Sequence, residues 1–336
     1  MKILIIKTGA LGDVVRCTFI AQALKDKYKR EKLEIYWLTS QLAKPMFNNN
    51  SYVAEVLVEN KQSFSKLKKI NFDLVINLEE SKELSALVSE LNTKKIQGFY
   101  MKNKKIIASE TAKEWFDMSA VGPSPKNDIL KIKNKKTHRQ LMSEIIEVKD
   151  YKKYAPFIRL TQNQRTIAND FLRRHNLSRS DLIIGFNPSG GSGRWNKNLP
   201  IKKASWLIEK LYKKYNATII LLGGPNEIER NKEIIKITKA PIISAGCGND
   251  LTEFPAIISV CSLVITTNSL ALHLSLALKR KTIVMIGPTS PTEIGMYGLG
   301  KKVIANSKCV GCYKKSCKAI EKINEKQILN EVEGLI

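Results

Sequence analysis

The residues best suited to chemistry stand where short apolar runs give way to glycine-containing turns. Near the N-terminus, the apolar run at residues 3–6 is followed by a turn with Gly9 and Gly12, and Asp13 comes directly after it. The glycines allow a tight turn, and Asp13 falls at the start of the next helical pattern. An aspartate in this place either caps the helix, its more common use, or acts as a general base toward a bound hydroxyl group. The local sequence leaves both roles open.

A second turn of this kind is rich in glycine and carries positive charge. It spans residues 187–197, follows an apolar run at residues 182–186, and contains Arg194 and Lys197. Small residues let backbone N–H groups approach an anion, and the two basic side chains supply the opposite charge, so the turn suits a diphosphate. A glycine-rich surface loop has the same composition, and the turn alone does not separate the two.

Two further turns offer groups that suit a nucleotide. Residues 222–227 end in Glu227, whose carboxylate could accept hydrogen bonds from ribose hydroxyls. In residues 266–273, Ser269 and the neighbouring backbone amides open a helix where a strand ends, an arrangement that favours phosphate. His273 lies within the first turns of that helix, and an isolated histidine on an apolar helix is more often packed in a core than catalytic.

Strands and helices must alternate to position these turns. Strand-like runs at residues 3–6, 33–38 and 73–77 alternate with helical patterns such as Val14 to Tyr28, and a second series of runs begins at residue 182. This alternation predicts an α/β fold with parallel sheets covered by helices on both faces. Such sheets bind ligands at the carboxyl ends of their strands, which is where the turns fall.

The length of the chain favours two domains. At 336 residues and 43% hydrophobic composition, the chain exceeds the size at which a single core usually stops growing. We expect the boundary between Tyr154 and Asp181, where Pro156 interrupts the pattern. The expected domains are residues 1–160 and 161–320, followed by a C-terminal helix at residues 321–336.

The chain is strongly basic. It has 56 Lys and Arg against 31 Asp and Glu, a formal net charge of +25. Such a field attracts anionic partners, among them phosphorylated glycans, lipid headgroups and nucleic acid, although biased composition alone would give the same total. The Tyr-Lys-Lys-Tyr runs at residues 151–154 and 212–215 fit nucleic-acid stacking. No RNA-binding signature accompanies them, so amphipathic helix faces are the better interpretation.

No segment of the sequence resembles a signal peptide or a membrane span. The first apolar run has four residues between two lysines, which is too short for the apolar region of a signal peptide. Nowhere does the chain approach about 18 consecutive uncharged apolar residues. We therefore expect a cytoplasmic protein, with at most peripheral contact at the inner face of the cytoplasmic membrane.

Six cysteines in a chain of this size do not form the dense pattern of a secreted disulfide framework, so thiols are the expected state. Cys309, Cys312 and Cys317 have a spacing that suits metal thiolates, but a structural zinc site takes four ligands and this segment offers three. Cys247 or Cys261 would complete such a site only if the fold brought one of them close. We expect no metal, with plain thiols or a partial disulfide as the better interpretation.

Considered together, the motifs resemble those of the ADP-heptose:lipopolysaccharide heptosyltransferases, glycosyltransferase family 9, in order and in spacing. The resemblance spans almost the whole chain. It implies the GT-B architecture, in which two Rossmann-like domains with parallel sheets face across a cleft, the first binding mainly the acceptor and the second the nucleotide sugar. The motifs are residues 7–16, Asn187-Pro188-Ser189, Lys197 with Leu199-Pro200, residues 224–227, residues 268–273 and Gly287-Pro288-Thr289.

The resemblance implies a role for each motif residue. Asp13 becomes the general base that deprotonates the acceptor hydroxyl, which outweighs the capping interpretation, and Gly12 and Arg16 become acceptor-binding. Lys197 would neutralise the departing diphosphate, and Glu227 would hold the ribose. The implied donor-binding residues are Ser189, Ser192, Lys197, Glu227, Asn268, Ser269, Leu270 and His273.

The implied reaction is an inverting, metal-independent transfer of a heptose or related sugar. The donor would be an ADP-sugar and the acceptor an anionic, lipid-linked glycan such as lipopolysaccharide core, with no cofactor and no nucleic acid. None of the nine aspartates stands in an Asp-x-Asp pair, which metal-dependent glycosyltransferases use to hold a cation on the diphosphate.

One motif departs from the family pattern. The chain has Asn268-Ser269-Leu270 where the family usually has Asp-Ser/Thr-Gly. An amide replaces a carboxylate that could bind donor sugar hydroxyls, and Leu270 replaces a glycine that lets the backbone approach the phosphates. The departure leaves the donor open. It is also the best argument for the alternatives, a non-catalytic basic protein that binds nucleotide sugars or nucleic acid and, more weakly, a GT-B sugar epimerase.

Overall fold

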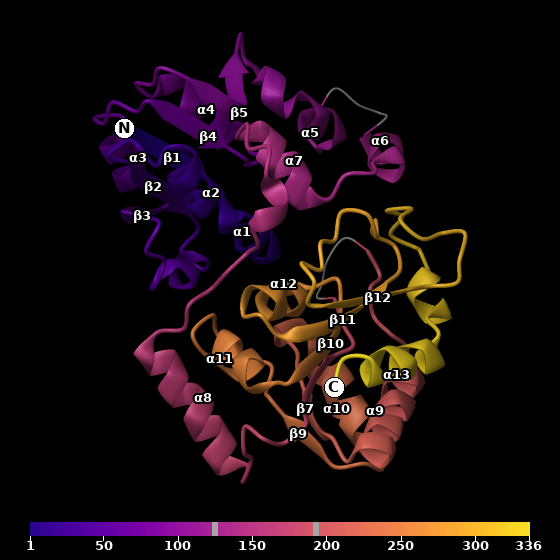
Figure 1. Cartoon of the computed structure of the whole chain (residues 1–336). Helices are drawn as coiled ribbons and strands as arrows, with labels where there is room; N and C mark the ends of the chain where they lie inside the picture. The colour runs from indigo at the N-terminus through magenta and orange to yellow at the C-terminus, as the bar shows by residue number, and fades with distance from the viewer. Residues whose placement is uncertain (123–126, 191–194) are drawn as a thin grey trace. The chain divides into compact units, whose positions relative to one another are not determined.

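The computed structural model describes residues 1–122, 127–190 and 195–336. The chain divides into two compact units, Met1–Arg159 and Leu160–Ile336 (Figure 1). Both are α/β units built on a six-stranded sheet. Among the described residues, every helix is too short or too polar to span a bilayer.

The sheet of the first unit has the strand order β3-β2-β1-β4-β5-β6. All its pairings are parallel except that of β5 with β6, which is antiparallel and forms one edge. The predicted parallel sheet is thus confirmed, with an antiparallel edge strand that the sequence pattern did not indicate. The strands are β1 (Lys2–Ile6), β2 (Glu34–Thr39), β3 (Glu55–Val58), β4 (Leu74–Asn77), β5 (Ile96–Lys102) and β6 (Lys105–Ala108).

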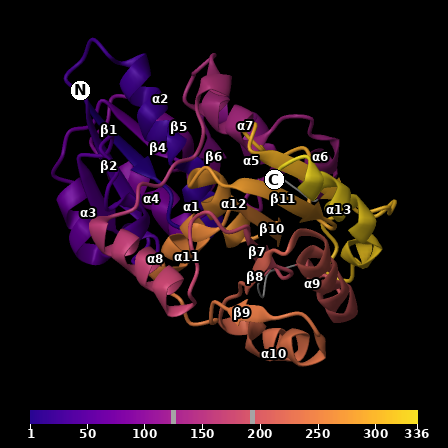
Figure 2. The ribbon, with the colours of Figure 1, turned by 60° about the horizontal axis from the view of Figure 1, so that its bottom comes forward.

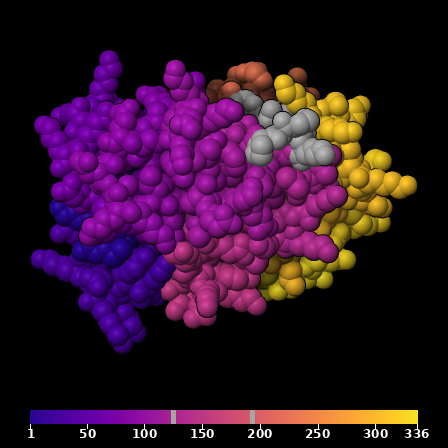
Figure 3. Space-filling model, turned by 90° about the horizontal axis from the view of Figure 1, so that it is seen from above, coloured from indigo at the N-terminus to yellow at the C-terminus, as the bar shows by residue number. Residues whose placement is uncertain are grey.

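Helices cover this sheet, and the central strands are therefore buried on both faces. Residues 3–6 of β1 have no exposed surface, as expected for a near-continuous apolar run inside a parallel sheet. On the face drawn in Figure 3, the indigo N-terminal segment shows little surface beneath the violet segments that follow it. The helices are α1 (Leu11–Cys17), α2 (Phe19–Lys27), α3 (Lys61–Leu67), α4 (Lys82–Glu90), α5 (Lys113–Met118), α6 (Asn127–Lys133) and α7 (His138–Ile145).

The first helical segment is interrupted at Thr18. The sequence pattern predicted one helix from Val14 to Tyr28, and the structure instead has α1 and α2, which meet at this residue. The Thr18 hydroxyl donates to the Val15 carbonyl oxygen at 2.8 Å and accepts from the Phe157 N–H at 3.0 Å. Side-chain bonds of this kind compete with the helical ladder, so α1 ends early and stays short.

The second unit repeats the strand order of the first. Its sheet is ordered β12-β11-β10-β7-β8-β9, and every pairing is parallel. The succession β10, β7, β8, β9 can be followed in Figure 2. The sequence pattern missed the two edge strands, because β9 has only three residues and β12 carries two lysines. The strands are β7 (Ile183–Asn187), β8 (Thr218–Leu221), β9 (Ile242–Ser244), β10 (Leu263–Thr267), β11 (Lys281–Ile286) and β12 (Gly300–Ile304).

The last helix belongs to the core of the second unit. It spans α13 (Glu325–Glu333), a shorter segment than the expected residues 321–336, and it buries Ile328 and Val332 against the cluster that also contains Leu207 and Ile208. The other helices of this unit are α8 (Gln162–Arg174), α9 (Ile201–Tyr215), α10 (Ile228–Ile237), α11 (Glu253–Val260) and α12 (Leu270–Ala277).

Candidate active site

In the first unit, a buried ion pair fixes the turn that follows β1. Strands β1 and β4 are parallel neighbours, with Ile6 opposite Asn77, so the turns after them leave the same edge of the sheet. The Glu79 carboxylate accepts hydrogen bonds from the Thr8 and Gly9 N–H groups, each at 2.8 Å. The Lys7 ammonium lies 3.2 Å from the same oxygen. The turn is therefore held by a carboxylate from the neighbouring strand end.

The surroundings keep both members of this pair charged. Burial opposes the charged form of Lys7, but the Asp13 and Glu79 carboxylates outweigh it and raise the pKa of the Lys7 ammonium. Burial also opposes the charged form of Glu79, yet Lys7 and the two backbone N–H groups lower the pKa of its carboxyl. Sequence reasoning missed Glu79. The sequence shows only a carboxylate two residues after a buried strand. This position predicts a contact with the β1 turn only when that strand, β4, is known to pair with β1.

Asp13 lies at the third position of α1, where its carboxylate is accessible. The cap residue of this helix is Ala10, so Asp13 is not the cap residue. Its Oδ1 accepts from the Arg16 guanidinium at 2.7 Å, and its side chain is 37% exposed against 12% for Arg16. Arg16 thus orients a carboxylate that is accessible from outside, and Gly12 directly precedes Asp13 in the same helical turn.

In the second unit, hydroxyl and amide groups connect the ends of β7 and β10. These strands are parallel neighbours with Asn187 opposite Thr266. The Asn187 amide donates to the Ser269 hydroxyl at 2.9 Å, and that hydroxyl lies 3.0 Å from the hydroxyl of Thr266. Ser269 is the cap residue of α12, but its hydroxyl makes no cap bond to that helix. The N–H groups of the first turn of α12 are therefore suited to an external anion.

Lys197 crosses from the β7 turn to this helix start. Its ammonium donates to the Asn268 carbonyl oxygen at 2.6 Å. The lysine packs so closely on Gly190 that a Cβ there would lie 2.5 Å from its own Cβ, which explains the glycine. Ser189 is 1% exposed, and its hydroxyl has no hydrogen-bond partner among the described residues. A buried hydroxyl in that state is costly unless something else satisfies it.

Asn268 links this site to the turn after β11. Its amide donates to the Thr289 hydroxyl at 3.1 Å. An aspartate at this position could only accept a hydrogen bond from that hydroxyl. Leu270, the first residue of α12, is half-buried, and His273 is buried within the helix. Sequence reasoning did not identify Thr266 and Thr289 as supports, although both stand in the motifs.

Glu227 lies at the end of the next strand, in the turn after β8. It is buried, and its Oε2 accepts from the Gly224 N–H at 2.8 Å. The neighbouring Arg230 guanidinium donates to the Leu199 carbonyl oxygen. Burial lowers the pKa of this guanidinium, and the Glu233 and Glu227 carboxylates oppose the shift. Because β8 pairs with β7, Glu227 stands at the same edge of the sheet as Ser189.

Ser192 and Arg194 lie outside the described residues. Four of the other expected donor residues lie close together. The Thr267 hydroxyl donates to the Ser189 carbonyl oxygen at 2.8 Å, and Thr267 is followed in the chain by Asn268, which accepts from Lys197, and then by Ser269.

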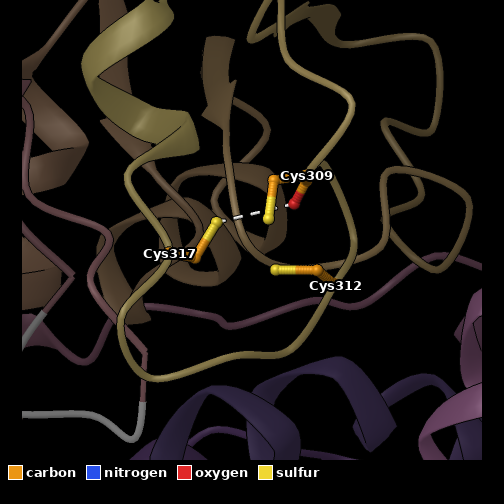
Figure 4. A group of neighbouring side chains, drawn as sticks. All are labelled: Cys309, Cys312 and Cys317. Carbon is orange, nitrogen blue, oxygen red and sulfur yellow. Dashed lines mark hydrogen bonds between the residues drawn. The ribbon is translucent and has the colours of Figure 1, made fainter.

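Three cysteines of the C-terminal segment meet, as Figure 4 shows. The sulfurs of Cys309, Cys312 and Cys317 all lie within 4.8 Å of one another. Neither of the cysteines that could have supplied a fourth ligand joins this group within the described residues. Cys261 is buried beside Gly185 in β7, where burial raises its pKa to about 12, and the Cys247 sulfur accepts from the Asn231 amide at 3.5 Å.

Known proteins are similar to this chain in sequence and in fold over nearly their full length. The sequence model of glycosyltransferase family 9 (heptosyltransferase) matches residues 62–326. Lipopolysaccharide heptosyltransferase 1 of Campylobacter coli is 22% identical, covering 100% of this chain and 99% of that protein. The family 9 glycosyltransferase of Veillonella parvula DSM 2008 has a TM-score of 0.80 at 18% identity, covering 99% and 96%. ADP-heptose lps heptosyltransferase II of E. coli has a TM-score of 0.71 at 15% identity, covering 100% and 98%.

Two α/β units with one strand order, in a fold that these structures share over 99% or more of the chain, have the GT-B architecture of glycosyltransferases. Within that class, the chain belongs to glycosyltransferase family 9, the heptosyltransferase family, and it is an enzyme. The non-catalytic alternative is set aside on this ground.

The Lys7–Glu79 pair predicts a pH-dependent contribution to stability. Because the pKa of Glu79 is lower in the folded chain than its unfolded value near 4.3, its carboxylate stabilises the fold above that pH, and the effect is lost as the pH falls through the folded pKa. We expect Glu79→Gln to lower the free energy of unfolding by roughly 2–4 kcal/mol at neutral pH, since it leaves a buried lysine without its nearest partner. The measurement is urea unfolding at neutral pH and at an acidic pH at which titration of the wild-type chain shows the Glu79 carboxyl to be protonated.

The cost of Glu79→Gln should shrink at the lower pH, where the wild-type carboxyl is protonated too. Glu83→Gln, at an exposed position in the first turn of α4, serves as the matched control and should change stability little at either pH. An equal cost at both pH values would contradict the role of the charge.

Proposed function

We propose that this enzyme transfers a heptose or related sugar from an ADP-sugar to a hydroxyl group of an anionic, lipid-linked glycan such as lipopolysaccharide core. Similar proteins carry names that include lipopolysaccharide heptosyltransferase and ADP-heptose lps heptosyltransferase. The observation that carries the proposal is the arrangement at the ends of β7 and β10. A lysine ammonium and a helix start come together there with the buried hydroxyl of Ser189, which has no hydrogen-bond partner within residues 1–122, 127–190 and 195–336.

The second unit is the donor-binding unit in this proposal. The first N–H groups of α12 and the Lys197 ammonium bind the diphosphate, because a helix N-terminus and a cation both favour negative charge. Ser189 donates its buried hydroxyl to the same group. Glu227 accepts hydrogen bonds from the ribose hydroxyls through its Oε1, because the bond to the Gly224 N–H uses only Oε2. Ser192 and His273 complete the proposed donor residues.

The first unit binds the acceptor and supplies the base. Asp13 takes the proton of the acceptor hydroxyl as that oxygen attacks the anomeric carbon, and Arg16 holds the carboxylate in place. The bond from the anomeric carbon to the diphosphate oxygen breaks in the same step, so the configuration inverts and ADP leaves. Lys197 and the start of α12 stabilise the charge that develops on the leaving diphosphate.

Asn268 and Leu270 tune the choice of donor. Asn268 presents an amide where the family usually has a carboxylate, and that amide already donates to Thr289. Two groups of the Asn268 amide then contact the hydroxyls of the donor sugar. Its Oδ1 accepts a hydrogen bond, and its second amide hydrogen donates one. We accordingly expect a narrower preference among ADP-sugars than a carboxylate would give.

The net charge of +25 fits a phosphorylated acceptor and an anionic membrane surface. We place the reaction in the cytoplasm, with peripheral contact at the inner face of the membrane.

The decisive experiment is a donor screen with a lipopolysaccharide core acceptor, read by the released nucleotide. We expect turnover with ADP-heptose above that with ADP-glucose and with uridine diphosphate sugars. Release of nucleotide that does not depend on the acceptor, or turnover restricted to uridine diphosphate sugars, would refute the proposal.

Asp13→Asn tests the base. We expect turnover to fall by roughly 100-fold or more with nearly unchanged donor affinity, because the isosteric amide can still accept from Arg16 but cannot take a proton. The measurements are kcat and the dissociation constant of the ADP-sugar. Asp170→Asn, in an exposed ion pair with Arg173, is the control and should keep full activity. A fully active Asp13→Asn enzyme would rule out the assigned role.

Lys197→Ala tests the diphosphate site. We expect weaker ADP-sugar binding and a loss of about 100-fold in kcat/KM, because the leaving group loses its positive partner where charge develops. Lys202→Ala, which removes an exposed lysine from the first turn of α9, is the matched control. Unchanged donor affinity and rate in the Lys197 variant would sink this assignment.

The missing Asp-x-Asp pair predicts that divalent cations are dispensable for transfer. Initial rates measured directly after the addition of EDTA should equal those without it, since a lysine and backbone amides stabilise the diphosphate instead of a cation. Immediate loss of activity that magnesium or manganese restores would show that the proposed mechanism is wrong.

A further inference from the structure

The cluster of Cys309, Cys312 and Cys317 lies on the core of the second unit. Cys317 is buried within that core, while Cys309 and Cys312 are half-buried and pack against it. The sulfurs converge to within 4.8 Å (Figure 4). In a tetrahedral thiolate site with metal–sulfur bonds of about 2.3 Å, the sulfurs stand about 3.8 Å apart. The observed cluster needs to contract by about 1 Å or less to reach that geometry.

Backbone N–H groups point at two of these sulfurs. The Lys314 N–H donates to the Cys312 sulfur at 3.5 Å, and the Ala319 N–H donates to the Cys317 sulfur at 3.4 Å, each from two residues further along the chain. Such bonds stabilise thiolate charge and orient metal ligands. Three thiolates around a divalent cation leave a net negative charge. Four lysines of the same segment offset it, namely Lys308, Lys314, Lys315 and Lys318.

The cysteine segment supports the turn that follows β11. Strands β11 and β12 are parallel neighbours, so the chain after each leaves the same edge of the sheet. The Gly311 N–H donates to the Gly287 carbonyl oxygen at 3.1 Å, and the Tyr313 N–H to the Pro288 carbonyl oxygen at 2.9 Å. The next residue of that turn is Thr289, which accepts from Asn268.

We propose that Cys309, Cys312 and Cys317 bind a thiophilic divalent cation of the zinc type as three thiolates, with the fourth position taken by water or a small external ligand. The thiols release their protons when the metal binds. Soft thiolates favour zinc over magnesium or calcium, and zinc accepts a tetrahedral arrangement without a further demand on geometry. The bound cation fixes the segment that carries Gly311 and Tyr313. Through these it holds the turn that contains Thr289.

The test uses the full chain, stripped of metal under reducing conditions and then titrated with Zn²⁺ against a chromophoric zinc indicator. We expect one zinc per chain and, with Co²⁺ in its place, the visible bands of a tetrahedral site together with thiolate charge-transfer absorption. Cys312→Ser should abolish this binding, and so should Cys309→Ser. Cys247→Ser, which alters a half-buried cysteine outside the cluster, should retain both the stoichiometry and the spectrum.

Zinc should also raise the midpoint of thermal unfolding of the wild-type chain by about 3 °C or more, and it should leave that of Cys312→Ser unchanged. No zinc uptake by the reduced chain, or equal uptake by Cys312→Ser, would overturn the proposal. A disulfide between two of the three cysteines that persists in the chain and leaves no zinc binding after its reduction would overturn it as well.

The effect on the donor site rests on the proposed function and has its own readout. Removal of zinc should raise the KM for the ADP-sugar about 3-fold or more with little change in kcat, because the turn with Thr289 loses support while Asp13 is unaffected. Zinc stoichiometry is measured without any sugar donor. A chain that binds zinc but turns over no ADP-sugar therefore contradicts the proposed function alone, and a chain that transfers sugar but binds no zinc contradicts this inference alone.

Discussion

The candidate residues of each unit depend on the parallel pairing of two strands, β1 with β4 in the first unit and β7 with β10 in the second. In both units the strand order reverses between these two strands, β1 and β4 in one and β7 and β10 in the other. The connections from these two strands run in opposite directions along the sheet, and right-handed connections then place the following helices on opposite faces. The turns therefore diverge, and ligand-binding groups collect at the strand ends. The register sets which side chains meet there, and a slip of one residue would turn each of them to the opposite face.

The two units use this edge in different ways. In the first unit, the Thr8 and Gly9 N–H groups bind the Glu79 carboxylate, and Lys7 neutralises that carboxylate. These contacts hold the turn in place, and its N–H groups bind an anion of the chain itself and not an external one. In the second, the hydroxyl of Ser269 is engaged by side chains and makes no cap bond to α12, so the helix start can take an external anion. This difference supports the proposed assignment of the glycan acceptor to the first unit and of the nucleotide donor to the second.

The departure at Asn268 has a structural counterpart in the turn after β11. An amide there can donate to the Thr289 hydroxyl, whereas a carboxylate could only accept from it. That turn is in turn hydrogen-bonded to the cysteine segment through Gly311 and Tyr313. Asn268, which differs from the family pattern, and the cysteines that the proposed reaction does not use thus belong to one connected structure at the edge of the proposed donor site.

The sequence by itself determined the class of fold and the positions of most candidate groups, because strand periodicity and glycine-containing turns are local properties of the chain. It placed Asp13, Lys197 and Ser269 at strand ends before any contact was known. It could not find Glu79, whose role exists only because β4 pairs with β1 and brings residues 70 positions apart into contact. For the three cysteines, the sequence showed only their spacing along the chain. Only the packing of their segment on the core decided that the sulfurs converge and that Cys247 and Cys261 lie elsewhere, since such distances depend on the whole fold.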